Sequence, residues 1–135
     1  MKAFGNLAPA LACASLLLAS GPSQTSAAQP AGLDGTWSGG GVVSFASGAN
    51  ERARCRAHYS RRTSTTYVVN ATCATASGRA TQTANLRSVG GNSYRGNFYN
   101  SEYNVSGTIH VVVHGNRQSV QLTSDAGSAS LQLSR

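Results

Sequence analysis

The sequence predicts an all-β protein, and two observations carry this prediction. After residue 30, apolar and polar residues alternate at period two almost throughout, and no stretch holds an apolar pattern at helical spacing. Clusters of Gly, Asn, Ser and Asp interrupt the alternation about every ten residues, which is typical of short strands joined by tight turns. An eight-stranded meander leaves two exposed edges unless its first and last strands pair. We therefore expect an antiparallel up-and-down barrel; a two-sheet β-sandwich is the alternative.

The strands follow from the alternation, and the turns follow from the residues that interrupt it. We expect strands at 35–46, 50–60, 65–76, 79–89, 93–99, 102–114, 117–124 and 128–134. The residues between them suit hairpin turns, with two-residue turns at Ser77-Gly78, Asn100-Ser101, Gly115-Asn116 and Ala126-Gly127, and three-residue turns at Thr63-Ser64-Thr65 and Gly90-Gly91-Asn92.

These turns predict one continuous inner face through seven of the strands. Residues that then face one another on neighbouring strands are small, aromatic or aliphatic. Taken strand by strand, the expected pairs are Cys55 with Cys73, Ala57 with Ala71, Tyr59 with Val69, Ala71 with Ala84, Ala84 with Phe98, Phe98 with Tyr103, Ile109 with Leu122, and Leu122 with Leu131.

Many residues of the expected inner face are small. They are Gly39, Gly41, Ala53, Ala57, Ala71, Ala84, Gly96 and Gly107. Two interpretations stay open: a filled, flattened core, or a hollow interior that holds a ligand.

Residues 1–28 have the features of a secretory signal peptide. Met1-Lys2 precedes a mostly apolar run that ends at Leu16-Leu17-Leu18-Ala19, and the small residues near Ala27 and Ala28 suit cleavage. The run is too short for a permanent span of about 20 residues, so no transmembrane segment is expected. A lipoprotein acylated at Cys13 is the alternative. The expected organisation is a cleaved signal peptide (1–28), a short N-terminal arm (29–34) and one barrel domain (35–135), exported to the periplasm or outside the cell.

Two cysteines remain after such a cleavage, Cys55 and Cys73. An exported chain meets an oxidising compartment, so we expect these two residues to form one disulfide. Two free buried thiols are the alternative.

Arginine dominates the charged residues. The full chain has 11 Lys/Arg, 4 Asp/Glu and a net charge of +7; removing residues 1–28 takes away Lys2 and leaves ten arginines against four acids, or +6. The most concentrated cationic or titratable group is Arg52, Arg54, Arg56, His58, Arg61 and Arg62. Its first three members, here called the Arg stripe, alternate with residues of the inner face and are expected to point outward.

The cationic group predicts a binding protein with an anionic partner. Planar guanidinium groups suit bidentate contact with phosphate, sulfate or carboxylate. In an exported protein this indicates an envelope glycan, lipopolysaccharide, lipid head groups or another acidic surface. A merely solvated charged face is the alternative. Nothing matches a base-reading module, so no specific nucleic acid is expected as a partner. The oligomeric state stays open.

No residue pattern points to catalysis or metal binding. The acids Asp34, Glu51, Glu102 and Asp125 fall at strand ends or turns, and no serine lies in a Gly-x-Ser-x-Gly motif. His110 and His114 share a strand face but lie roughly 13 Å apart, too far for one zinc ion at about 2 Å from each. We expect no enzymatic activity, no metal and no cofactor.

The two ends of the barrel carry a family resemblance. Gly35-Thr36-Trp37 at the start of a small eight-stranded barrel resembles the lipocalin and avidin group. Together with the two cysteines and the end Leu131-Gln132-Leu133-Ser134-Arg135, it is most similar to the Inh-type inhibitors of bacterial metalloproteases. The resemblance implies a periplasmic barrel with one disulfide whose N-terminal trunk, here about 29–33, enters a protease cleft. Protease inhibition is thus the first alternative function, and a small-ligand carrier with an internal cavity is the second. We expect Trp37 to plug one barrel end.

Overall fold

The computed structural model describes residue 21 and residues 32–135. The predicted signal peptide, its cleavage site and residues 29–31 of the arm lie outside the described residues, apart from residue 21. Eight strands follow in chain order: β1 (Gly35–Phe45), β2 (Asn50–Arg61), β3 (Thr66–Thr75), β4 (Gly78–Gly90), β5 (Ser93–Asn100), β6 (Val105–His114), β7 (Arg117–Ser124) and β8 (Gly127–Ser134). Each predicted strand is present, with its ends shifted by at most a few residues.

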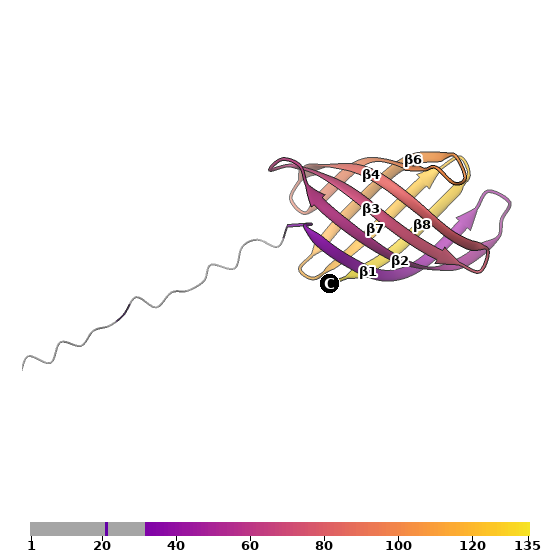
Figure 1. Ribbon diagram of the computed structural model, residues 1–135, viewed down its shortest axis with the longest axis horizontal. Coiled ribbons are helices and arrows are strands. Elements are labelled where there is room, and N and C mark those ends of the chain that lie inside the picture. The colour runs from indigo at the N-terminus through magenta and orange to yellow at the C-terminus, as the bar shows by residue number, and fades with distance from the viewer. Residues whose placement is uncertain (1–20, 22–31) are drawn as a thin grey trace, which may run out of the picture.

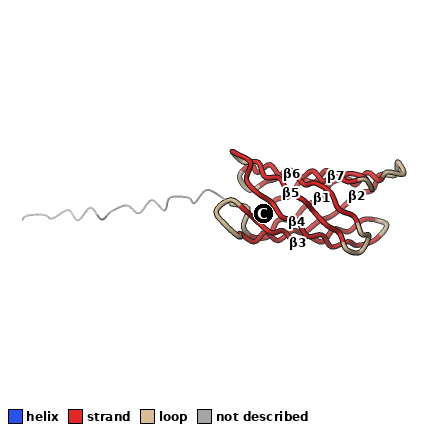
Figure 2. The backbone as a smooth tube through the Cα atoms, turned by 90° about the horizontal axis from the view of Figure 1, so that it is seen from above, coloured by secondary structure: helices blue, strands red, loops and turns tan. Residues whose placement is uncertain are grey.

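The strands form a closed antiparallel barrel in the order β1 to β8 (Figure 1). Each strand pairs with the next one in sequence, and β1 also pairs with β8, from Ser38 opposite Ser134 to Phe45 opposite Gly127. This pairing removes both free edges. The predicted up-and-down barrel is therefore confirmed, and the alternative sandwich is wrong. Figure 2 shows the turns gathered at the two ends of the strands.

The predicted inner face is confirmed, but the pairings predicted across three of the hairpins are not. Ala71 lies opposite Gln82, and Leu122 lies opposite Ala129. Both shifts have one cause: the two-residue turns are 76–77 and 125–126, one residue earlier than expected. Gly78 and Gly127 then begin their strands with φ of 141° and 142°, a backbone conformation that glycine adopts without strain. A shift of two residues keeps every side chain on its predicted face.

The turn between β5 and β6 differs most from the prediction. It has four residues, 101–104, so Phe98 faces Gly107 rather than Tyr103. The side chain of Asn100 stabilises this longer turn, because its Oδ1 accepts hydrogen bonds from the backbone N–H groups of Glu102 (3.0 Å) and Tyr103 (3.1 Å). Tyr103 therefore leaves the strand and is 60% exposed, instead of packing in the core.

Two inward glycines mark places where neighbouring strands come very close together. A Cβ on Gly96 would lie 1.6 Å from the carbonyl oxygen of Asn85, and one on Gly41 would lie 1.8 Å from that of Ser130. These positions exclude side chains because backbone occupies the space. The small residues of the inner face thus partly serve the tight curvature of the barrel, which glycine kinks permit.

The disulfide predicted between Cys55 and Cys73 is present. The two residues face each other on β2 and β3, with Cα atoms 4.1 Å apart, and both are buried inside the barrel. In residues 21 and 32–135, no helix has the length and apolar character needed to cross a membrane.

Candidate functional site

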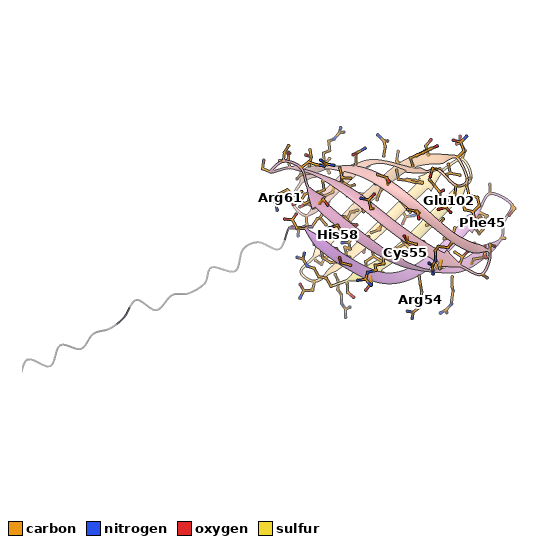
Figure 3. All side chains as sticks on the ribbon, in the orientation of Figure 1. Phe45, Arg54, Cys55, His58, Arg61 and Glu102 are labelled. Atoms are coloured by element: carbon orange, nitrogen blue, oxygen red, sulfur yellow. A yellow bond between two sulfur atoms is a disulfide. The ribbon has the colours of Figure 1, made fainter. Side chains whose placement is uncertain are left out.

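The barrel is hollow at the end where residues 46–49, 76–77, 101–104 and 125–126 form the turns. A cavity of about 520 Å³ opens there. Figure 3 shows Phe45 and Glu102 at this open end and Arg61 at the opposite end. Every strand contributes wall residues, so closure of the barrel is what creates the cavity. The wall consists of Val43, Phe45, Ser47, Ala49, Glu51, Cys73, Thr75, Ser77, Gly78, Ala80, Gln82, Phe98, Asn100, Tyr103, Val105, Leu122, Ser124, Ala126, Gly127, Ser128 and Ala129.

The wall is mostly apolar in its depth, where Gln82 is the polar exception, and it is polar at its mouth. Phe98 and Leu122 are buried and line both the cavity and a narrow void of about 30 Å³ further inside the barrel. Serines, Asn100 and Glu51 lie nearer the turns. Such a combination of apolar surface with a few polar groups is typical of small-molecule sites.

Hydrogen bonds between turns hold the mouth open in a defined shape. The carboxylate of Glu51 accepts from the N–H of Ser77 (2.8 Å) and from its hydroxyl, which lies 2.6 and 2.7 Å from the two carboxylate oxygens. Glu102 accepts from the N–H of Thr81 (3.1 Å). The N–H of Ala46 donates to the carbonyl of Ala126 (2.9 Å). Each bond joins elements that are distant in sequence, so together they fix the positions of these strands and turns around the mouth.

A tight aromatic cluster closes the opposite end. Trp37 and Leu33 are fully buried, and the indole Nε1–H donates to the carbonyl of Leu33 (2.9 Å). The Trp37 ring meets Tyr59 edge to face at 6.4 Å, and the guanidinium of Arg135 lies 4.4 Å from its centroid on the outer side. Arg135 also donates to the carbonyl of Asp34 (2.8 Å). Trp37 is thus placed as the predicted plug, and the cavity has one mouth.

A buried polar pair, Tyr59 and Gln118, lies beside Trp37. The Tyr59 hydroxyl donates to Oε1 of Gln118 (2.5 Å), and burial raises the pKa of Tyr59 above its ordinary value. Gln118 is 1% exposed, and its Nε2 has no hydrogen-bond partner in the described structure. The protonated tyrosine therefore satisfies the carbonyl half of this buried glutamine.

The Arg stripe lies on the outside of the barrel along β2, as predicted. Arg52, Arg54 and Arg56 are exposed and alternate with the buried residues Ala53, Cys55 and Ala57; Figure 3 shows Arg54 pointing away from the barrel. On β1 the stripe faces Val42, Gly40 and Ser38, which bring no acid against it.

His58 continues the outward face of β2 beyond Arg56, as predicted, whereas Arg61 and Arg62 lie at the end of β2 and in the turn that follows it. His58 is exposed, and its Nδ1 lies 3.1 Å from the hydroxyl of Thr36. Arg61 lies at the closed end, where its Nε pairs with Asp34 (3.2 Å) and its guanidinium lies 5.3 Å from the Tyr67 ring centroid. Arg62 is exposed in the turn after β2. Within residues 32–135, the pair of Arg61 and Asp34 is the only salt bridge, so Arg61 is the member of the group that has an acidic partner.

A second basic row crosses β4, β5 and β6 on the outer surface. Arg87 directly faces Arg95, which directly faces His110. Like charges in such cross-strand positions repel each other. Sequence analysis missed this row, although the predicted register that sets Ala84 opposite Phe98 also sets Arg87 opposite Arg95.

Sequence analysis left an internal cavity open as an alternative, but it did not place the cavity at one end of the barrel or name Glu51 in its wall. The signal in the sequence was the position of Glu51, which lies two residues before the inward Ala53 and therefore belongs to the inner face of β2. His110 and His114 lie on β6, and no three His, Cys, Asp or Glu side chains gather as a metal site within residues 32–135.

The fold resembles solved β-barrels, all at low sequence identity. The redesigned β-barrel mFAP1 bound to DFHBI has a TM-score of 0.65 and 17% identity, covering 76% of this chain and 94% of that one. EF1p2_mFAP2b bound to DFHBI has a TM-score of 0.62 and 12% identity, covering 76% and 93%. A de novo designed fluorescence-activating β-barrel has a TM-score of 0.59 and 17% identity, covering 76% and 92%. At these identities the likeness shows the fold alone. No protein-family model and no curated protein matches the chain.

Two predictions stay predictions at this point. The resemblance to Inh-type inhibitors is based on the two chain ends and the two cysteines, and residues 29–31 of the N-terminal trunk that it implies lie outside the described range. Export is indicated in general terms by the disulfide, because such bonds persist in oxidising compartments.

Proposed function

We propose that this protein is a non-enzymatic carrier that binds a small, largely apolar molecule in the cavity at the open end of its barrel. The single observation that carries the proposal is the cavity of about 520 Å³. This volume lies within the range of about 300–1,000 Å³ that is typical of small-molecule pockets. Because Trp37 and its neighbours close the other end, a ligand would enter and leave through one mouth.

The shape of the wall supports a carrier more than a filled structural barrel. Ala80 and Ala129 line the cavity where larger aliphatic residues would have filled it. Unlike Gly41 and Gly96, these positions bear a Cβ, so tight backbone contact does not explain their small size. An apolar ligand that fills the space would gain the contacts that the wall now lacks.

Partly filling the cavity is expected to weaken ligand binding without unfolding the barrel. Ala129→Phe places a ring in the space that a ligand would occupy. We expect the affinity for the neutral apolar dye Nile red, measured by fluorescence titration, to fall about tenfold or more, which corresponds to about 1.4 kcal/mol. Ala80→Phe is a second, independent filling variant from β4.

The matched control is Ser130→Phe. Ser130 follows Ala129 on β8 and faces outward, so the same ring is added outside the barrel. Its affinity for the dye is expected to equal that of the parent. Circular dichroism confirms folding of each variant. The carrier proposal is wrong if the parent does not bind apolar dyes at all, or if both filled variants fold and bind as the parent does.

The exposed Arg stripe supports a second candidate function, the contact with an anionic surface that the sequence predicts. Its three arginines have no acidic partner within salt-bridge distance in the described structure, and they follow one strand face at about 6.6 Å intervals. Exposed charges act on a partner through a field that decays over about 8 Å at physiological salt. Binding to heparin or lipopolysaccharide should therefore weaken steeply as salt rises.

Changing Arg52, Arg54 and Arg56 together to Gln is expected to remove most of this salt-dependent binding. Outward substitutions of this kind usually change stability by less than about 0.5 kcal/mol each, so the fold should persist. Heparin affinity chromatography and vesicle sedimentation measure the effect. The charge-matched control changes Arg87, Arg95 and Arg117 to Gln. If both triple variants lose binding equally, overall charge rather than the stripe is responsible.

A further inference from the structure

The cavity wall contains one charged side chain among the described residues. Glu51 is the one acid or base among the wall residues, since no arginine, lysine, histidine or aspartate of the described chain lines the cavity. Within residues 32–135, the basic residues lie on the outer surface or at the closed end. Thus a chain with a positive net charge has a single carboxylate in its cavity wall, while Glu102 and Asp125 lie at the same end of the barrel but outside that wall.

Glu51 is fixed at the mouth rather than free in solvent. It faces Val43 across the β1–β2 ladder and is partly buried. Its carboxylate is held by the N–H and the hydroxyl of Ser77, as described above. Arg52, the next residue, faces outward because side chains alternate along a strand.

The carboxylate has neutral donors but no cation. The salt bridge within residues 32–135 joins Arg61 and Asp34 at the closed end, so Glu51 has no cation within 4.0 Å. A carboxylate has about four lone-pair sites, and Ser77 supplies only two donor groups. Acceptor capacity and a negative charge therefore remain at the entrance to an apolar space.

We propose that the cavity selects compact apolar amines over apolar acids. This inference rests on the proposed carrier function. The hydrocarbon part packs against Phe98 and Leu122, and the ammonium group stays at the mouth and donates to the carboxylate of Glu51. A carboxylate ligand would instead place two like charges together in a partly desolvated site, where no cation compensates them. The outer arginines act at longer range through screened fields, whereas Glu51 contacts the ligand.

A matched ligand series tests the selectivity. Adamantylamine, adamantanol and adamantane carboxylate share one hydrocarbon cage and differ in head-group charge. By isothermal titration calorimetry at pH 7, the parent is expected to bind the amine about tenfold or more tightly than the carboxylate, since charge-assisted hydrogen bonds are about twice as strong as neutral ones. The alcohol should lie between them.

Substitution of Glu51 tests whether this residue causes the preference for the amine. Glu51→Gln keeps an acceptor for Ser77 and removes the charge, so the amine should lose its advantage over the alcohol. The matched control is Asp125→Asn, which changes net charge equally at the same end of the barrel but does not line the cavity. It should keep the preference for the amine.

The outcomes separate the two proposals. If the three ligands bind the parent equally, or the carboxylate binds best, selectivity for amines is wrong while the carrier function stands. If none binds and Nile red does not bind either, both are wrong. The affinities of the parent protein for the three ligands test the selectivity even if Glu51→Gln does not fold. Equal loss of preference in Asp125→Asn would show that net charge, not Glu51, selects the ligand, and would also overturn the inference.

Discussion

Replacing Trp37 with alanine is expected to lower the free energy of unfolding by about 3–5 kcal/mol, as for other buried tryptophans. The indole is fully buried, and three residues at the closed end contact it. The carbonyl of Leu33 accepts a hydrogen bond from the indole N–H. The Tyr59 ring packs edge to face with the indole, and the guanidinium of Arg135 lies over the indole face. Alanine would leave a void at the barrel end and a buried carbonyl of Leu33 without a donor, and each of these defects is destabilising.

Urea denaturation followed by circular dichroism measures this effect. Trp37→Phe retains most of the apolar volume but lacks the indole N–H, so its loss should be smaller than that of Trp37→Ala. Tyr99→Ala serves as an aromatic control on the outside, where the side chain is 48% exposed, and should change stability by less than about 0.5 kcal/mol. A Trp37→Ala protein that unfolds within about 1 kcal/mol of the parent would show that Trp37 does not hold the closed end together.

Loss of the disulfide is the second large effect we expect. The double variant Cys55→Ala/Cys73→Ala should lose roughly 2–5 kcal/mol of stability, because a crosslink reduces the conformational entropy of the unfolded chain. The bond joins residues 18 positions apart on two neighbouring strands. It therefore closes the hairpin of β2 and β3, which carries both the Arg stripe and Glu51.

Two measurements check this prediction. Parent protein from an oxidising compartment, denatured without reductant, should contain no thiol that reacts with an alkylating agent. Denaturation of the parent with and without reductant should reproduce the stability difference of the double variant, and the reduced parent is the control for any packing change caused by alanine. Two alkylated cysteines per chain in the unreduced protein would contradict the disulfide.

The inward and outward faces of this barrel could be predicted because they are a local property of a strand. Alternation along residues 52–59 places arginines outside and small or aromatic residues inside, whatever the strand pairs with. Two of the predicted hairpins are shifted by two residues and one by four, yet the inner face keeps its predicted residues wherever they remain in a strand. An even shift moves a strand along its neighbour without turning it over.

Exact turn positions were less predictable because several adjacent small or polar residues can each form a turn. Gly78 and Gly127 were predicted to lie inside turns. In the structure both have positive φ values and are the first residues of their strands. Around Asn100 the decisive contribution is a side-chain hydrogen bond to two of the following N–H groups, which lengthens the turn to four residues. Composition alone does not distinguish these arrangements.

The sequence by itself determined the strand pattern, the crosslink between Cys55 and Cys73, and the outward position of the Arg stripe. It also predicted that Trp37 plugs one end of the barrel, but only the tertiary structure decided that the opposite end is hollow. Trp37, Tyr59 and Gln118 come from three separate places in the chain and fill one end, while Ala80 and Ala129 leave space at the other. The difference depends on the total side-chain volume that the eight strands place inside the barrel at each level. This total is defined only when β1 pairs with β8 and closes the barrel.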